Sequence, residues 1–368
     1  MNKSTEFPFE KKMRTLGALM KRHFVVYFRN WQTVLFTMMV PLVIILVYIL
    51  FLRPLETSAV EEEITNYLEI TDELLNQVNG LVDSWMISGI LAVSCITVSL
   101  NVNTLMVRDK ENGITKDFSS SPIPTTMITM SYFLFNFCVT ALINMIVFFI
   151  SLIYLYCSGA IMIDVVSFFA LIGILLLSAL AGALLTFFIC NFIGKESVLA
   201  AVVAIFSAAV GFLIGAYLPV SMLPEGVEAL TGFFPGTYSA SLFRNYFMSY
   251  PVEVLSAEVP AEVISALTSY FSFDIQFFNY TVPPYMQVIV ILIFCGIFLV
   301  LNLAFTQKYF FRLPNFKKTK KAEASVSAEI SDDTPQPDMQ ENISSQIEEN
   351  AVTEDRNDNI QPPNEGGI

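Results

Sequence analysis

Six long stretches of apolar residues dominate the chain, and none of them contains an Asp, Glu, Lys, Arg or His. A helix that crosses the hydrocarbon core of a bilayer needs about 20 apolar residues. The stretches reach that length, and they are apolar on all sides rather than along one face. The sequence therefore predicts six membrane-spanning helices: Thr33–Leu52, Met86–Val107, Met127–Cys157, Val165–Phe192, Val198–Leu218 and Pro284–Gln307.

Residues 1–32 precede the first predicted span. Within them, apolar residues recur at helical spacing among lysines and arginines: Met13, Leu16, Met20, Phe24 and Phe28. This pattern is typical of an amphipathic helix that lies in the membrane surface. After the membrane domain of residues 33–307, residues 308–368 form a basic flank and an acidic, polar tail. Residues 322–368 contain too little apolar surface to fold, so we expect them to be disordered.

The positions of the basic residues predict the orientation of the chain. Lys and Arg gather before the first span, in the connection of residues 108–126 and after the sixth span. In the outer loops, residues 53–85 and 219–283, the only basic residues are Arg53 and Arg244. Because short basic flanks stay in the cytoplasm, we expect both termini there. The net charge of −13 comes from acidic residues in the outer loops and in the tail.

Two predicted spans carry a stripe of distinctive residues along one helix face. On the second span the stripe is polar and consists of Ser94, Thr97, Asn101 and Thr104. Because polar groups avoid lipid, this stripe predicts either hydrogen bonds between helices or the lining of a substrate pathway. On the fifth span the stripe consists of the small residues Ala201, Ala204, Ala208, Gly211 and Gly215. It allows close helix packing, either within one chain or between two subunits.

The connection of residues 219–283 is rich in aromatic residues. Aromatic side chains prefer the headgroup level of a bilayer, so we predict short helices at the outer leaflet. The candidate functional residues in this segment are Phe234, Pro235, Tyr238 and Arg244. Phe234 and Tyr238 are candidates for an outer gate, and Arg244 for a contact with lipid phosphate or for a structural ion pair.

Several function classes lose support because the residues they need are missing. The apolar stretches contain no carboxylate that could bind a coupling ion, which argues against an ion-driven carrier. The only histidine, His23, lies in the basic N-terminal segment, where it fits a role at the membrane interface or in setting the orientation of the chain. No cluster of His, Cys and carboxylates has the spacing of metal ligands, so we predict no catalytic or metal site. A membrane sensor or anchor, with the acidic tail as a partner site, is an alternative.

The connection between the second and third spans contains a recognisable set of residues: Arg108, Glu111, Gly113, Thr115 and Pro122. An acidic residue, a Gly, a Thr-rich or basic stretch and a Pro that opens the third helix resemble the permease subunits of ABC-2-type ATP-binding-cassette exporters. Further similar sequences are Phe28-Arg29-Asn30, Pro41-Leu42, Phe234-Pro235-Gly236-Thr237-Tyr238 and Leu242-Phe243-Arg244.

The resemblance implies an all-α membrane fold in which two six-helix subunits, identical or related, pair above cytoplasmic ATPase subunits. Residues 1–32 would contain the elbow helix, and residues 109–121 would form the coupling helix that docks on the ATPase. No Gly-x4-Gly-Lys-Ser/Thr phosphate-binding motif occurs in the chain. ATP and magnesium would therefore bind to the partner ATPase, and the other partners would be membrane lipids rather than nucleic acid.

The function implied by the resemblance is ATP-driven export across a plasma membrane, in a bacterial cell. The apolar spans favour a hydrophobic or amphipathic substrate: a drug, an antimicrobial peptide or a lipid-like compound. Export of a lipid-linked polysaccharide is an alternative, because it needs a polar, aromatic-lined channel and the Ser94 stripe supplies some polar groups.

Overall fold

The structure is a computed structural model, and it describes residues 9–65, 71–159, 162–224, 230–273, 275–277 and 280–309. The chain divides into two units, residues 1–313 and 314–368. The second unit lies outside the described residues, and so does the predicted disordered tail. Everything below concerns the first unit.

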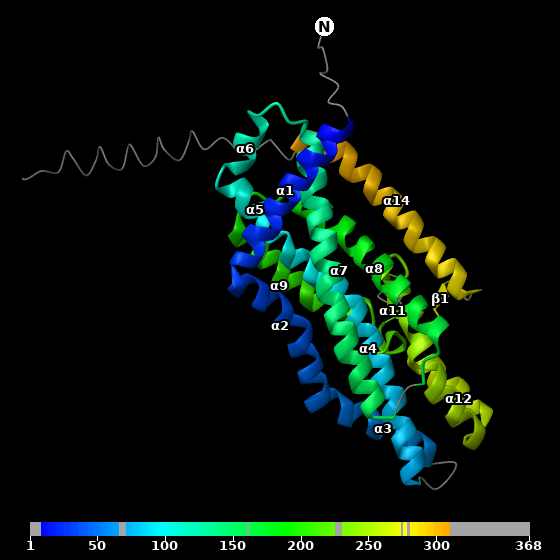
Figure 1. Ribbon diagram of the computed structural model, residues 1–368. Coiled ribbons are helices and arrows are strands. Elements are labelled where there is room, and N and C mark those ends of the chain that lie inside the picture. The colour runs from blue at the N-terminus through cyan, green and yellow to red at the C-terminus, as the bar shows by residue number, and fades with distance from the viewer. Residues whose placement is uncertain are drawn as a thin grey trace, which may run out of the picture. The chain divides into compact units, whose positions relative to one another are not determined.

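The described residues are helical almost throughout (Figure 1). The long helices are α1 Phe9–Arg29, α2 Trp31–Val47, α4 Asp72–Val102, α7 Thr125–Cys157, α8 Val165–Asn191, α9 Glu196–Leu213 and α14 Pro284–Tyr309. The shorter helices are the π-helix η1 Tyr48–Leu52, α3 Arg53–Thr65, α5 Thr104–Glu111, α6 Ile114–Ser119, the 3-10 helix η2 Val220–Met222, α11 Pro235–Phe247, α12 Ser249–Glu258 and α13 Ala261–Tyr270. A hairpin pairs the two-residue strands β1 Gln276–Phe277 and β2 Tyr280–Thr281.

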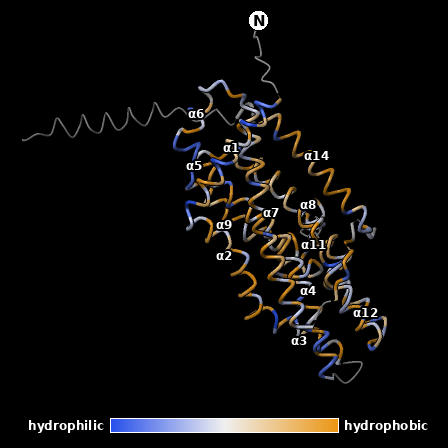
Figure 2. Tube along the Cα trace, viewed as in Figure 1, coloured by the Kyte–Doolittle hydropathy of each residue, from blue (hydrophilic) through white to orange (hydrophobic). Residues whose placement is uncertain are grey.

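Among the described residues, six helical segments are long and apolar enough to cross a membrane, in agreement with the predicted all-α membrane fold and its six spans. They are Trp31–Glu62, Asp72–Glu111, Thr125–Cys157, Val165–Asn191, Glu196–Leu213 and Pro284–Phe305. Apolar residues follow α2, α7 and α14 along their length, whereas hydrophilic residues gather at α5 and around α3 (Figure 2).

The largest difference from the prediction concerns the outer loop of residues 53–85. Helix α3 continues the first span beyond Arg53, and α4 begins at Asp72 rather than at Met86. The predicted spans ended at Arg53 and Asp83 because both residues are charged. In the structure the two charges neutralise each other, since Arg53 Nε donates to Asp83 Oδ1 across 2.8 Å. The predicted span Met86–Val107 contains no carboxylate, but the longer helix α4 also carries Asp83, which is buried and paired with Arg53.

Helix α4 is the centre of the bundle and packs against α2, α7, α8, α9 and α11. Every residue of α4 from Gly80 to Leu100 is buried. Two close approaches depend on glycines that have no Cβ. A Cβ on Gly182 of α8 would lie 2.6 Å from the carbonyl oxygen of Cys95, and one on Gly89 would lie 2.7 Å from the Cα of Ala216. Both neighbours therefore reach the backbone of α4 only because these residues are glycines.

The short helices predicted between the fifth and sixth spans are present as α11, α12 and α13. Pro235 occupies the first turn of α11, where its missing N–H leaves no hydrogen bond unmade. Helix α11 packs against α4, α8 and α14. Its aromatic residues Phe243 and Phe247 are fully buried, so this helix lies within protein rather than on an outer leaflet surface.

Candidate functional site

The charged side chains of the bundle gather near its two ends. We call the end that contains α5, α6 and the turn between α8 and α9 the basic end. The end that contains α3 and the start of α4 is the acidic end. The two ends lie far apart along the bundle (Figure 1).

At the basic end, α5 directs three charged side chains at the turn between α8 and α9. Arg108 Nε and Nη2 donate to the Glu196 carboxylate across 3.0 and 2.5 Å. Glu111 Oε2 accepts a hydrogen bond of 2.8 Å from the backbone N–H of Glu196. The buried Lys110 donates to the carbonyl oxygen of Cys190 across 2.9 Å. Arg108 and Glu111, which we predicted to serve ATPase coupling, therefore contact α9 of their own chain.

The chain turns between α5 and α6 at Gly113, where φ is +79°. Glycine adopts this left-handed conformation without the steric penalty of a Cβ. Thr115 of α6 is buried, and Pro122 is exposed in the turn before α7. The predicted coupling segment is thus a short helix on a tight turn, and its contact with an ATPase stays a prediction.

Helix α1 is fixed to the basic end through Asp109. Arg22 donates to Asp109 Oδ2 across 2.6 Å, and the Tyr132 hydroxyl donates to the same oxygen across 2.5 Å. His23 is fully buried, with its Nε2 2.9 Å from the Ser131 hydroxyl and its ring centroid 4.1 Å from that of Tyr132. The polar partners on α7 therefore hold His23 inside the protein rather than at a lipid-facing surface, and a role in setting the orientation of the chain stays a prediction.

His23 makes stability depend on pH. Burial, and then the charge of Arg22, lower the pKa of His23 to about 4, against about 6.5 in an unfolded chain. Between these values the unfolded chain binds more protons, so stability is complete above about pH 6.5 and decreases towards about pH 4. The slope should reach up to about 1.4 kcal/mol per pH unit. Thermal unfolding in detergent measures it, and His23→Gln should flatten the curve. Equal slopes for the variant and the original chain would contradict this assignment.

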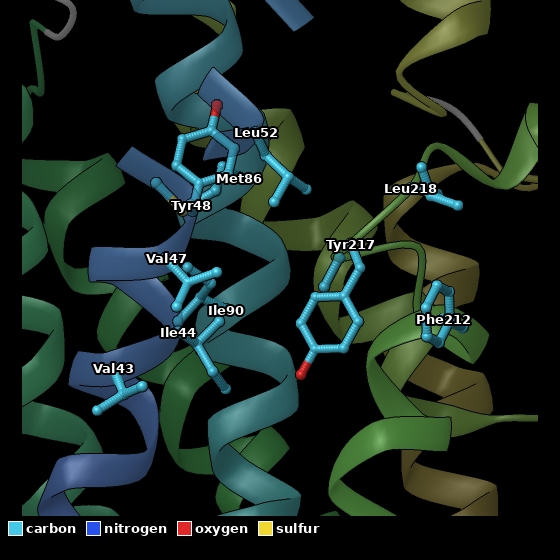
Figure 3. A pocket seen from close by; sticks show the side chains of 11 residues that line it. Val43, Ile44, Val47, Tyr48, Leu52, Met86, Ile90, Phe212, Tyr217 and Leu218 are labelled. Carbon is cyan, nitrogen blue, oxygen red and sulfur yellow. The ribbon is translucent and has the colours of Figure 1, made fainter. Parts of the chain in front are cut away.

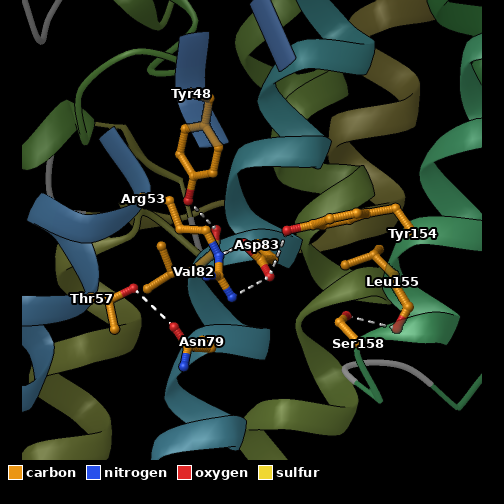
Figure 4. A network of polar contacts seen from close by, with 9 residues as sticks. All are labelled: Tyr48, Arg53, Thr57, Asn79, Val82, Asp83, Tyr154, Leu155 and Ser158. Atoms are coloured by element: carbon orange, nitrogen blue, oxygen red, sulfur yellow. Dashed lines mark hydrogen bonds and ion pairs between the residues drawn. The ribbon is translucent and has the colours of Figure 1, made fainter. Parts of the chain in front are cut away.

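At the acidic end, Asp83 is the centre of a buried polar network (Figure 4). Its carboxylate accepts hydrogen bonds from Arg53 Nε and Nη2, at 2.8 and 3.2 Å, and from the Tyr154 hydroxyl at 3.1 Å. The Tyr48 hydroxyl donates to the carbonyl oxygen of Val82 across 3.2 Å. The network joins the first span to α4 and α7. The sequence did not predict this network, although Arg53 is one of only two basic residues in the predicted outer loops.

The predicted polar stripe on the second span faces protein. The Ser94 hydroxyl donates to Asn144 of α7, which is a hydrogen bond between helices. Thr97 and Asn101 bond to carbonyl oxygens of α4 itself. Thr104 is half-buried at the start of α5, beyond a break in the helix. Hydrogen bonding between helices is thus observed at one position, and a substrate pathway along the stripe stays a prediction.

The stripe of small residues on the fifth span is divided by the structure. Its three alanines, Ala201, Ala204 and Ala208, are exposed on α9. Gly211 is covered by the ring of Tyr217 from the same chain, and Gly215 lies beyond the end of α9 with φ of +71°. Only the alanine part of the stripe is therefore open to a second subunit, and that contact stays a prediction.

The predicted outer residues fix the turn into α11. Phe234 is half-buried and directly precedes Pro235. Tyr238 is buried, and its hydroxyl donates to the carbonyl oxygen of Gly232 across 2.7 Å. These contacts stabilise a turn, and a gating role for either aromatic residue stays a prediction.

Arg244 is buried and has neither of the partners that we predicted. Its Nη2 donates to the carbonyl oxygen of Gly215 across 2.6 Å, and its Nη1 donates to that of Ser272 across 3.2 Å. The guanidinium also lies 5.8 Å from the ring centroid of Trp85. None of the ion pairs among the described residues includes it, and at 1% exposure it is out of reach of lipid. Burial lowers the pKa of Arg244 to about 9, so it is still protonated at pH 7.

An apolar cavity of about 460 Å³ lies between α2, α4 and the end of α9 (Figure 3). Its lining consists of Val43, Ile44, Val47, Tyr48, Leu52, Met86, Ile90, Phe212, Ala216, Tyr217 and Leu218. The hydroxyls of two tyrosines are the only polar side-chain groups in this lining. Cavities of this volume suit small organic molecules, and this lining suits an apolar one.

Comparison with known families decides the class of the protein. The family described as ABC-2 type transporter matches residues 14–248, which is more than half of the chain and includes the cavity and both charged networks. The chain belongs to the ABC-2 type transporter family. A search of curated proteins found no match. As an ABC-2 transporter, the chain is a multi-pass membrane protein and the permease component of an ABC transporter, and it works with an ABC ATPase rather than being one.

Proposed function

We propose that this ABC-2 permease exports a hydrophobic or amphipathic compound, such as a drug, an antimicrobial peptide or a lipid-like molecule. The observation that supports this proposal is the apolar cavity between α2, α4 and the end of α9. Carbohydrate hydroxyls need hydrogen-bond partners when they leave water, and this lining offers almost none. Export of a lipid-linked polysaccharide is therefore the less favoured candidate.

The energy would come from a separate ATPase docked at the basic end. The short helix α6 on the Gly113 turn offers a compact docking element there. The basic end would then face the cytoplasm of a bacterial cell, with both termini on that side, as the distribution of Lys and Arg favours. ATP and magnesium would bind to the ATPase, and a second permease subunit, identical or related, would complete the transporter.

Gly113→Ala tests the docking element. An alanine in the left-handed conformation costs about 1–2 kcal/mol, which should displace α6 without removing the chain from the membrane. We expect a several-fold loss of ATP-dependent dye export from cells. Gly159→Ala is the matched control, because Gly159 has a similar φ of +69° in the turn after α7. Equal losses for the two variants would show that backbone strain alone, and not ATPase docking, explains the effect.

The transport function itself is tested by accumulation of hydrophobic dyes in cells that produce the permease together with its ATPase. We expect export to stop when ATP is depleted and to continue when a protonophore collapses the proton gradient. Export that fails with the protonophore at full ATP would contradict the proposal. Retention of apolar dyes combined with export of lipid-linked sugar would replace the proposed substrate class.

A further inference from the structure

Helix α9 is held by charged side chains at both of its ends. At the basic end, Arg108 donates two hydrogen bonds to the Glu196 carboxylate. The Glu111 carboxylate accepts a hydrogen bond from the backbone N–H of Glu196. At the other end, Arg244 donates to the carbonyl oxygen of Gly215, just beyond the last turn. Between these points α9 is sparsely covered, and its buried residues are Leu199, Val210 and Gly211.

We infer that Glu196 is a positioning residue that makes α9 follow the movement of α5 and of the loop after it. The inference rests on the proposed function, because the movement would come from an ATPase docked at the basic end. Glu196 itself touches neither ATP nor substrate. It acts through Arg108 and Glu111 of α5, which directly precede the turn and the helix α6 that would receive the ATPase.

The geometry of the contact suits this role. Arg108 meets the carboxylate with two parallel N–H groups, an arrangement that fixes orientation as well as distance. The Glu111 carboxylate, also on α5, accepts a hydrogen bond from the backbone N–H of Glu196. Three hydrogen bonds thus join two residues of α5 to the first residue of α9. A helix with few buried residues of its own is expected to follow such an anchor.

The contribution of this ion pair to stability is small, which separates positioning from folding. The side chains of Arg108 and Glu196 are 36% and 40% exposed. Ion pairs at such exposure contribute little to stability, because water screens both charges. Reversing one charge should therefore leave the fold in place and act on the movement of α9.

The end of α9 near Gly215 connects this helix to α11, so a movement of α9 can be transmitted to the rest of the bundle. Arg244 belongs to α11, and its guanidinium holds Gly215 by a hydrogen bond that is fully buried. Helix α11 packs against α4, α8 and α14. A displacement of α9 would therefore reach α11 and the cavity wall formed by Phe212 and Tyr217.

Spin-label distances within the complete transporter test the inference. Labels at Ile205→Cys on α9 and Ile153→Cys on α7 measure the distance between these two helices. Both side chains are well exposed, so a label fits at either position. The exposed Cys138 and Cys157 are replaced by serine in this background. Distances are measured without nucleotide and after trapping with ATP, magnesium and vanadate. The variants are Arg108→Glu, Glu196→Arg and the double reversal Arg108→Glu/Glu196→Arg.

We expect trapping to shift the distance in the original chain, each single reversal to abolish the shift, and the double reversal to restore it. The matched control reverses the exposed pair Glu10 and Arg14 on α1, which should leave the shift unchanged. An unchanged shift in the single variants would overturn the inference, as would a double variant without rescue. So would a transporter that hydrolyses ATP without any shift, and there the proposed function would survive. A chain that purifies without an ATPase would overturn both.

Discussion

Replacing Arg53 by alanine should lower the free energy of unfolding by about 3 kcal/mol, the lower end of the range for breaking a buried ion pair. Among the described residues, the variant leaves the Asp83 carboxylate, which is fully buried, with only the Tyr154 hydroxyl as a hydrogen-bond partner. Asp83→Asn should cost less, because Arg53 is 31% exposed and can turn its guanidinium to water. Thermal and denaturant unfolding in detergent measure both variants.

The matched control for Arg53 is Arg14, whose pair with Glu10 is exposed on α1. Arg14→Ala should change stability by less than about 1 kcal/mol. If Arg53→Ala and Arg14→Ala had the same small effect, Asp83 would not depend on a buried partner, and the acidic-end network would have to be revised.

Gly182→Ala should destabilise the bundle by about 1–3 kcal/mol, because the added methyl group overpacks the contact between α8 and α4. Its Cβ would lie 2.6 Å from the carbonyl oxygen of Cys95, and backbone atoms of α4 cannot rotate away as a side chain can. The unfolding transition of the purified chain measures the loss.

Gly173 of the same helix provides the control, because a Cβ there would meet nothing within 4 Å. Gly173→Ala should stabilise α8 by up to about 1 kcal/mol through helix propensity. Opposite signs for the two variants are therefore expected. A neutral Gly182→Ala would mean that α8 and α4 do not approach as closely as the structure places them.

The membrane architecture was predictable from the sequence because hydropathy is a local property. The start of α8 at Val165 and the end of α7 at Cys157 agree with the predicted residues. The start of α4 was missed, since a run of uncharged residues cannot continue through Asp83. The partner that tolerates this charge, Arg53, is 30 residues away along the chain. A charge in a span is thus not by itself a functional site or a span boundary.

The candidate site was less predictable for the same reason. Arg108 and Glu111 were identified by their sequence context, but their partner Glu196 lies beyond two further spans. Nothing in a single sequence pairs these residues, and the positions of α5 and α9 are set by packing on α4. The sequence marked Arg244 as a rare basic residue in an outer loop. Its partners are backbone carbonyl oxygens, which every residue has, so the residue types could not predict them. Pairings of side chains with the backbone are therefore the part that only a structure supplies.

Membership of the ABC-2 family makes this chain a permease component that works with a separate ABC ATPase. The most direct test is purification of the full-length chain from native membranes in mild detergent, with identification of its partners and an assay of ATP hydrolysis. We expect a stoichiometric ABC ATPase subunit to copurify with the chain and the purified complex to hydrolyse ATP. A chain that purifies without such a subunit and without ATP hydrolysis would contradict it.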